Sequence, residues 1–124
     1  MQTKRPLDGL SVLVVEDEAA VALMLEDFLA ERGAVVVGPV ADAESALQRI
    51  ADERIDCAVV DYGLVGGTSL PVADALMARG VPFLFASGYD IGGFDPRYAG
   101  VPRLDKVYSA DDLLRLLADI LGRT

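Results

Sequence analysis

Ser11-Val12-Leu13-Val14-Val15 is a run of apolar, mostly β-branched residues that ends abruptly at Glu16, Asp17 and Glu18. A run of this length and composition is typical of a buried β-strand. Similar runs recur at residues 34–40, 57–60, 82–86 and 101–104, the second of them interrupted at Gly38-Pro39. Because strands buried on both faces read as unbroken apolar runs, this repetition predicts a parallel sheet with helices on both sides.

Segments with helical spacing separate the predicted strands. The first stops at Gly33, the second follows Asp42 as a capping residue, and the third closes at Gly80. The last opens at Ser109, three residues before Asp112, which is the spacing of a capping box. The apolar positions expected to face the core are Val21, Met24, Leu25, Phe28, Leu29, Ala43, Ala46, Leu47, Ile50, Val72, Ala73, Leu76, Met77, Leu113, Leu114, Leu117, Ile120 and Leu121.

Alternating strands and helices in a chain of 124 residues predict one α/β domain. We expect a flavodoxin-like, doubly wound three-layer sandwich with a five-stranded parallel sheet in the order 2-1-3-4-5. The domain is expected to span residues 1–124, with its core at about 10–121, and no repeat or linker is visible.

Composition narrows the range of functions. The net charge of −9 argues against nucleic-acid binding. The sequence has no histidine to ligate a metal, and Cys57, its single cysteine, leaves no partner for a disulfide within the chain. No signal peptide or membrane-spanning run of ~20 apolar residues is visible, so we expect a cytoplasmic protein with no membrane partner.

Polar residues follow four of the five predicted strands. Glu16 and Asp17 follow the first strand, Asp61 the third, Ser87 the fourth and Lys106 the fifth. The carboxyl ends of parallel strands meet at one edge of the sheet, where this fold places its ligands beside the switch point between strands one and three. We therefore expect these side chains to converge.

Such a convergence has a chemical use. Two carboxylates about 5 Å apart repel each other by roughly 3 kcal/mol at an effective dielectric constant near 20. Mg²⁺ relieves that repulsion, since it prefers carboxylates, waters and phosphate oxygens. A carboxylate beside the cation can act as a nucleophile and form an acyl phosphate, with Ser87 and Lys106 stabilising the transferred group.

Each of these residues also has an ordinary structural interpretation. Asp17 would serve as the N-cap of the first helix, and Glu16 would complement the dipole of that helix. Asp61 would form a turn before Gly63, Ser87 would begin a turn with Gly88, and Lys106 would be a solvated surface lysine.

The quoted motifs resemble those of response-regulator receiver domains of the CheY-like type, over essentially the whole chain. The resemblance rests on residues 12–18, on Val59-Val60-Asp61, on Ser87 and on Lys106, while residues 82–89 resemble the FATGUY-type single-domain subfamily. It implies that Asp61 accepts a phosphoryl group. It also implies that Mg²⁺ is bound by Asp17, Asp61 and the Gly63 carbonyl, with Glu16 acting partly through water. Ser87 and Lys106 would contact the phosphoryl oxygens.

Two departures from the receiver pattern are visible. Receivers normally follow the lysine with proline in a cis peptide bond, whereas Val107 follows Lys106 here, and we expect a trans bond because a cis bond without proline costs about 3–4 kcal/mol. We expect the trans bond to alter the coupling between phosphorylation and Tyr108, which occupies the position of the aromatic switch residue in receivers. The alternative interpretation of Tyr108 is an ordinary half-buried aromatic residue. The fourth helix is expected to be shortened or irregular, since residues 88–100 contain four glycines and Pro96.

The resulting hypothesis is a single-domain response regulator of a two-component phosphorelay. Its partners would be a sensor histidine kinase or histidine phosphotransfer protein and an unknown downstream protein. The downstream protein would be contacted in part by the last helix, whose apolar face is widened by Leu116. It would not be an enzyme beyond catalysing its own phosphorylation and dephosphorylation. The alternatives are a degenerate receiver that binds partners without phosphorylation, a Mg²⁺ phosphatase with an aspartyl nucleophile, and, more weakly supported, a flavin-binding protein.

Overall fold

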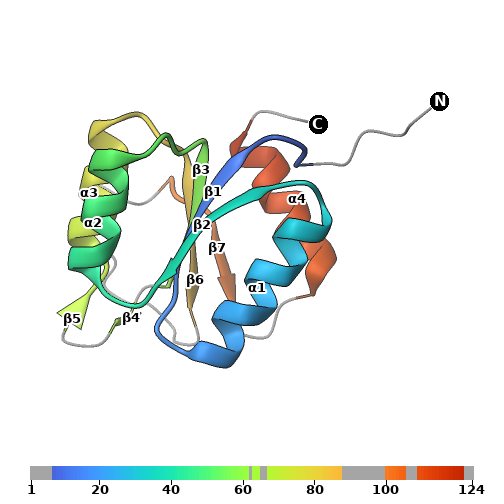
Figure 1. Ribbon diagram of the computed structural model, residues 1–124, viewed down its shortest axis with the longest axis horizontal. Coiled ribbons are helices and arrows are strands. Elements are labelled where there is room, and N and C mark those ends of the chain that lie inside the picture. Colours follow the sequence, from blue (N-terminus) through green and yellow to red (C-terminus); the bar gives the residue numbers. More distant parts are fainter. Residues whose placement is uncertain (1–6, 62, 65–66, 88–99, 106–108, 122–124) are drawn as a thin grey trace.

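The protein folds as a three-layer α/β sandwich, seen in a computed structural model that describes residues 7–61, 63–64, 67–87, 100–105 and 109–121 (Figure 1). The central sheet has five strands in the order β2-β1-β3-β6-β7, and every neighbouring pair is parallel. Counted along the sheet strands alone, this is the predicted order 2-1-3-4-5. The strands are β1 (Ser11–Val15), β2 (Val35–Val40), β3 (Cys57–Asp61), β6 (Phe83–Ser87) and β7 (Arg103–Asp105).

Among the described residues, two helices cover each face of this sheet. Figure 1 places α2 and α3 on one side and α1 and α4 on the other. Side chains of β1 alternate between the two faces, with Leu13 and Val15 in the core cluster beside α2 and α3. Val12 and Val14 belong to the cluster beside α1 and α4. The helices are α1 (Ala19–Glu31), α2 (Ala43–Asp52), α3 (Leu70–Ala78) and α4 (Ala110–Ile120).

Capping residues begin two helices as predicted. The backbone N–H of Ser45 donates to the Asp42 carboxylate at 2.7 Å at the start of α2. At the start of α4, Ser109 and Asp112 form the reciprocal capping box. Helix α1 differs from the sequence alternative, because its N-cap is Glu18 rather than Asp17.

Three apolar residues that we expected to face the core lie partly in solvent. Met24 is 54% exposed, Met77 46% and Leu47 36%. In α1, the buried face is formed by Ala22, Leu25 and Leu29. Met24 is adjacent to Leu25 in the sequence but lies outside this buried face. A stripe of apolar residues can thus be wider than the face that the sheet covers. Leu116, in contrast, packs partly buried against the core of the α1–α4 side.

Other details depend on the assembled sheet. The last two strands begin one and two residues later than the apolar runs at 82–86 and 101–104. The segment after Asp61 forms a short antiparallel pair of β4 (Gly63–Leu64) and β5 (Gly67–Thr68). Leu7, before the expected core range, is buried and its N–H donates to the Arg32 carbonyl at 2.9 Å.

Within the described ranges, no helix has the length and apolar character needed to span a membrane. The prediction of a shortened helix between residues 88 and 99 falls outside the part of the chain that the structure describes.

Candidate functional site

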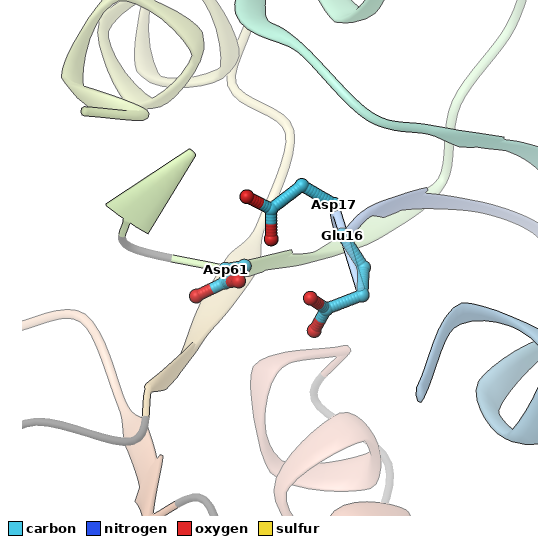
Figure 2. A group of neighbouring side chains, drawn as sticks. All are labelled: Glu16, Asp17 and Asp61. Atoms are coloured by element: carbon cyan, nitrogen blue, oxygen red, sulfur yellow. The ribbon is translucent and has the colours of Figure 1, made fainter. Parts of the chain in front are cut away.

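The carboxyl ends of β1 and β3 bring three acidic side chains together. These strands pair in parallel with Val15 opposite Val60, so the residues that follow on each strand lie side by side. Glu16, Asp17 and Asp61 each offer a carboxylate oxygen, and these oxygens all lie within 4.8 Å of one another. Figure 2 shows the Asp17 and Asp61 carboxylates close together, with Glu16 approaching from the other side of the end of β1.

The three acids differ in burial. Glu16 is only 8% exposed, whereas Asp17 and Asp61 are half-buried. A buried carboxylate requires hydrogen-bond donors, and Glu16 receives one from the backbone N–H of Glu18 at 3.0 Å. The backbone N–H of Glu16 in turn donates to the carbonyl of Val40 at 2.9 Å, which links this residue to the end of β2.

The bond from Glu18 to Glu16 was not foreseen from the sequence. The sequence carries no local signal for it, because Asp17, just before Glu18, is the more usual type of capping residue. The sequence alternative places Asp17 at the N-cap of α1 and has Glu16 complement the dipole of that helix. In the structure Glu16 supplies an acceptor to the chain just before the helix.

The acidic cluster has the composition and size of a site for one small divalent cation. In octahedral coordination, ligand oxygens about 2.1 Å from Mg²⁺ lie about 3–4 Å from each other. Three carboxylate oxygens within 4.8 Å of one another can therefore share a single cation, directly or through a bound water. Hard oxygen ligands of this kind suit Mg²⁺ rather than a soft metal.

The other residues predicted for the site are described to different extents. Ser87 ends β6 at the same edge of the sheet, one position beyond Ala86, which pairs with Asp61. Gly63 lies in β4, two residues after Asp61. Lys106, Val107 and Tyr108 lie outside the described residues, and so does the predicted trans peptide bond.

Comparisons with known proteins give similar proteins along nearly the whole chain. The solution structure of SdrG from Sphingomonas melonis Fr1 is 42% identical, with a TM-score of 0.80, and covers 94% of this chain and 98% of that one. The BeF3-activated conformation of SdrG from Pseudomonas melonis Fr1 is 43% identical, with a TM-score of 0.76, over 90% and 95% of the two chains.

Two Pseudomonas aeruginosa proteins are also similar. The receiver domain of sensor histidine kinase PA1611, solved with a magnesium ion coordinated in its active-site cleft, is 25% identical, with a TM-score of 0.80, over 92% of this chain and 98% of that one. The two-component response regulator PhoP is 42% identical over 74 residues, which are 60% of this chain and 32% of PhoP. The chain thus matches about a third of the length of PhoP. No protein-family model matches the chain.

Strand order, the position of the acidic cluster and these similarities agree with one another. SdrG supplies the strongest sequence argument, because its identity of 42% extends over almost all of both chains. The chain belongs to the CheY-like receiver domains of two-component response regulators.

Proposed function

We propose that this receiver accepts a phosphoryl group on Asp61 from a histidine kinase or a histidine phosphotransfer protein. It acts as a single-domain response regulator of the FATGUY type and signals by contact with a downstream protein. The observation that carries it is the group of three carboxylates within 4.8 Å at the carboxyl edge of a receiver sheet. Asp61 lies at the end of β3 in this group and is half-buried, so its carboxylate is accessible to a donor.

Two relatives support the proposal. The receiver of PA1611 holds a magnesium ion in its active-site cleft. SdrG, of which this chain covers 98%, has been solved in a BeF3-activated conformation. By analogy, Glu16, Asp17, Asp61 and the carbonyl of Gly63 would hold Mg²⁺ here, and the cation would offset negative charge on the acids and on the phosphoryl oxygens.

The proposed reaction is a phosphoryl transfer between two side chains. A carboxylate oxygen of Asp61 attacks the phosphorus of a phosphohistidine, the P–O bond forms as the P–N bond breaks, and the leaving imidazole nitrogen takes a proton. The product is an aspartyl phosphate. Ser87 and Lys106 would contact its oxygens, and Tyr108 would respond to the change.

The donor histidine lies outside these 124 residues, because they contain no histidine. This absence also simplifies the chemical assignment of any label. An aspartyl phosphate is an acyl phosphate and is cleaved by hydroxylamine, whereas phosphate esters of Ser, Thr or Tyr resist it.

The test is to incubate the protein with radiolabelled acetyl phosphate, with and without Mg²⁺, and to follow covalent labelling. We expect one hydroxylamine-sensitive phosphoryl group per chain in the wild type and none in Asp61→Asn. Asp119→Asn is the matched control, since Asp119 is an exposed residue of α4 outside the acidic cluster.

Each other outcome supports a different function. Absence of label from a folded wild type, together with unchanged partner binding by Asp61→Asn, supports a phosphorylation-independent interaction module. Steady release of phosphate from unrelated esters supports a phosphatase. Equal labelling of wild type and Asp61→Asn moves the acceptor to another residue.

A further inference from the structure

The short segment between β1 and α1 is closed by a side chain rather than by a backbone turn. The Oε2 atom of Glu16 accepts the backbone N–H of Glu18 at 3.0 Å. Together with the covalent chain, this hydrogen bond closes a ring that contains the backbone N, Cα and C atoms of Asp17. The ring therefore restricts the backbone dihedral angles of Asp17, on which the direction of its carboxylate depends.

Both ends of this ring are attached to regular structure. On one side, the N–H of Glu16 donates to the carbonyl of Val40 at the end of β2. On the other side, the carbonyl of Glu18 accepts the N–H of Ala22 at 2.9 Å, in the first turn of α1. Glu18 has extended backbone angles, and its own side chain makes no capping hydrogen bond. The Glu16 carboxylate therefore ties the end of the sheet to the start of the helix.

Burial makes Glu16 suitable for a fixed orientation. The residue is 8% exposed, so its side chain has little freedom to rotate, while Asp17 and Asp61 keep partial access to solvent. Figure 2 shows its carboxylate on the opposite side of the β1 end from the carboxylate of Asp17. One of its oxygens accepts the N–H of Glu18, and the remaining lone pairs of the carboxylate can face a cation or its water shell.

We infer that Glu16 is a positioning residue, whose hydrogen bond to Glu18 fixes the backbone of Asp17 and so holds the Asp17 carboxylate beside Asp61. This inference rests on the proposed function, since the reaction it serves is the phosphorylation of Asp61. It assigns Glu16 two separable properties, a negative charge that attracts the cation and an acceptor oxygen that sets geometry. Charge affects how much Mg²⁺ is needed, whereas geometry affects the rate once Mg²⁺ is saturating.

Two substitutions separate these properties. Glu16→Gln removes the charge and keeps an acceptor oxygen of nearly the same reach, while Glu16→Ala removes both. We expect Glu16→Gln to need a higher half-saturating Mg²⁺ concentration than the wild type and, at saturating Mg²⁺, to label faster than Glu16→Ala. We expect Glu16→Ala to label about 10–100-fold more slowly than the wild type at any Mg²⁺ concentration. The reason is that more Mg²⁺ does not return a displaced Asp17 carboxylate to its position. Glu44→Ala, at an exposed position in the first turn of α2, is the control for loss of a glutamate.

A second measurement needs neither cation nor phosphoryl donor. In the metal-free protein, NMR hydrogen exchange of the Glu18 amide reports the hydrogen bond directly. We expect the same protection in wild type, Glu16→Gln and Glu44→Ala, and about fivefold faster exchange in Glu16→Ala. This readout also detects the effect if Glu16→Ala is too unstable for the labelling assay.

Two results overturn the inference. One is an equal labelling rate for Glu16→Gln and Glu16→Ala at saturating Mg²⁺. The other is an unchanged Glu18 amide exchange rate in Glu16→Ala. Both differ from failure of the proposed function, in which the wild type itself is not labelled.

Discussion

The pair of strands β1 and β3 has acidic residues at its amino end and at its carboxyl end, and these residues serve different purposes. At the amino end, the Asp56 carboxylate accepts the backbone N–H of Ser11 at 2.8 Å and the guanidinium of Arg54 at 3.1 Å. The backbone N–H of Asp56 donates back to the carbonyl of Ser11, which closes the pair of strands. At the carboxyl end, three carboxylates lie within 4.8 Å of one another.

The two ends differ in the groups that lie near each carboxylate. The Asp56 carboxylate accepts from Ser11 and from Arg54, so its charge stabilises the fold where β1 and β3 begin. Grouped like charges repel each other and reduce stability unless a cation or a hydrogen bond compensates. We interpret the amino end as structural and the carboxyl end as the functional end of the same two strands.

The largest stability effect is expected at the carboxyl end, on addition of Mg²⁺. A ligand that binds only the folded state at one hundred times its dissociation constant raises the free energy of unfolding by about 2.7 kcal/mol. We expect a gain of that size from urea unfolding of the wild type, and its complete loss on adding EDTA. Asp56→Ala should keep the gain, and Asp17→Asn should lose most of it. An equal gain in Asp17→Asn would contradict the assignment of this end as the cation site.

A smaller effect is expected at the amino end. Asp56→Ala leaves the N–H of Ser11 in a partly buried position without its acceptor, which should lower the free energy of unfolding by about 2 kcal/mol. Arg54→Ala is the matched control and should cost little, because Arg54 is 84% exposed in its ion pair. Urea unfolding measures both. Acetyl phosphate labelling of Asp61 should remain at the wild-type level in each variant, and a loss of labelling in Asp56→Ala would show that the two ends are not independent.

The smallest effect concerns Asp42, a carboxylate that also follows a strand but serves as a helix cap. The backbone N–H of Ser45, and then its side chain, lower the pKa of Asp42 below its ordinary value of 3.8. A carboxyl group whose pKa is lower in the folded state contributes stability above the unfolded value and loses it as the pH falls through the folded pKa. Asp42→Asn keeps a capping acceptor that does not titrate. We therefore expect the thermal midpoint of the wild type to fall relative to Asp42→Asn below pH 3.8, and a difference that is constant with pH would contradict this.

Much of the fold could be predicted because its determinants are local. The apolar runs at β1 and β3 read directly as buried strands, and Asp42, Ser109 and Asp112 mark helix starts because capping depends on neighbours three residues away. The exposure of Met24 and Met77 could not be predicted in this way. It depends on how much of each helix the sheet covers, which is decided by packing between distant segments.

The candidate site, too, could be predicted from the sequence only in part. The meeting of Glu16 and Asp17 with Asp61 followed from strand type and strand order, since parallel neighbours end at the same edge. The hydrogen bond between Glu16 and Glu18 did not follow, because a glutamate side chain has many rotamers. Burial at the end of β1 leaves few of them.

The sequence by itself determined the class of fold, the edge of the sheet that carries the acidic residues and the residues that begin α2 and α4. Only the tertiary structure decided that Glu16 is buried and bonded to Glu18, that Leu7 joins the core, and that β4 and β5 pair after Asp61. The physical reason is the separation along the chain of the residues that determine each feature. Strand and helix preferences are set by residues a few positions apart, whereas burial and side-chain direction are set by contacts that exist only once the sheet and its helices have assembled.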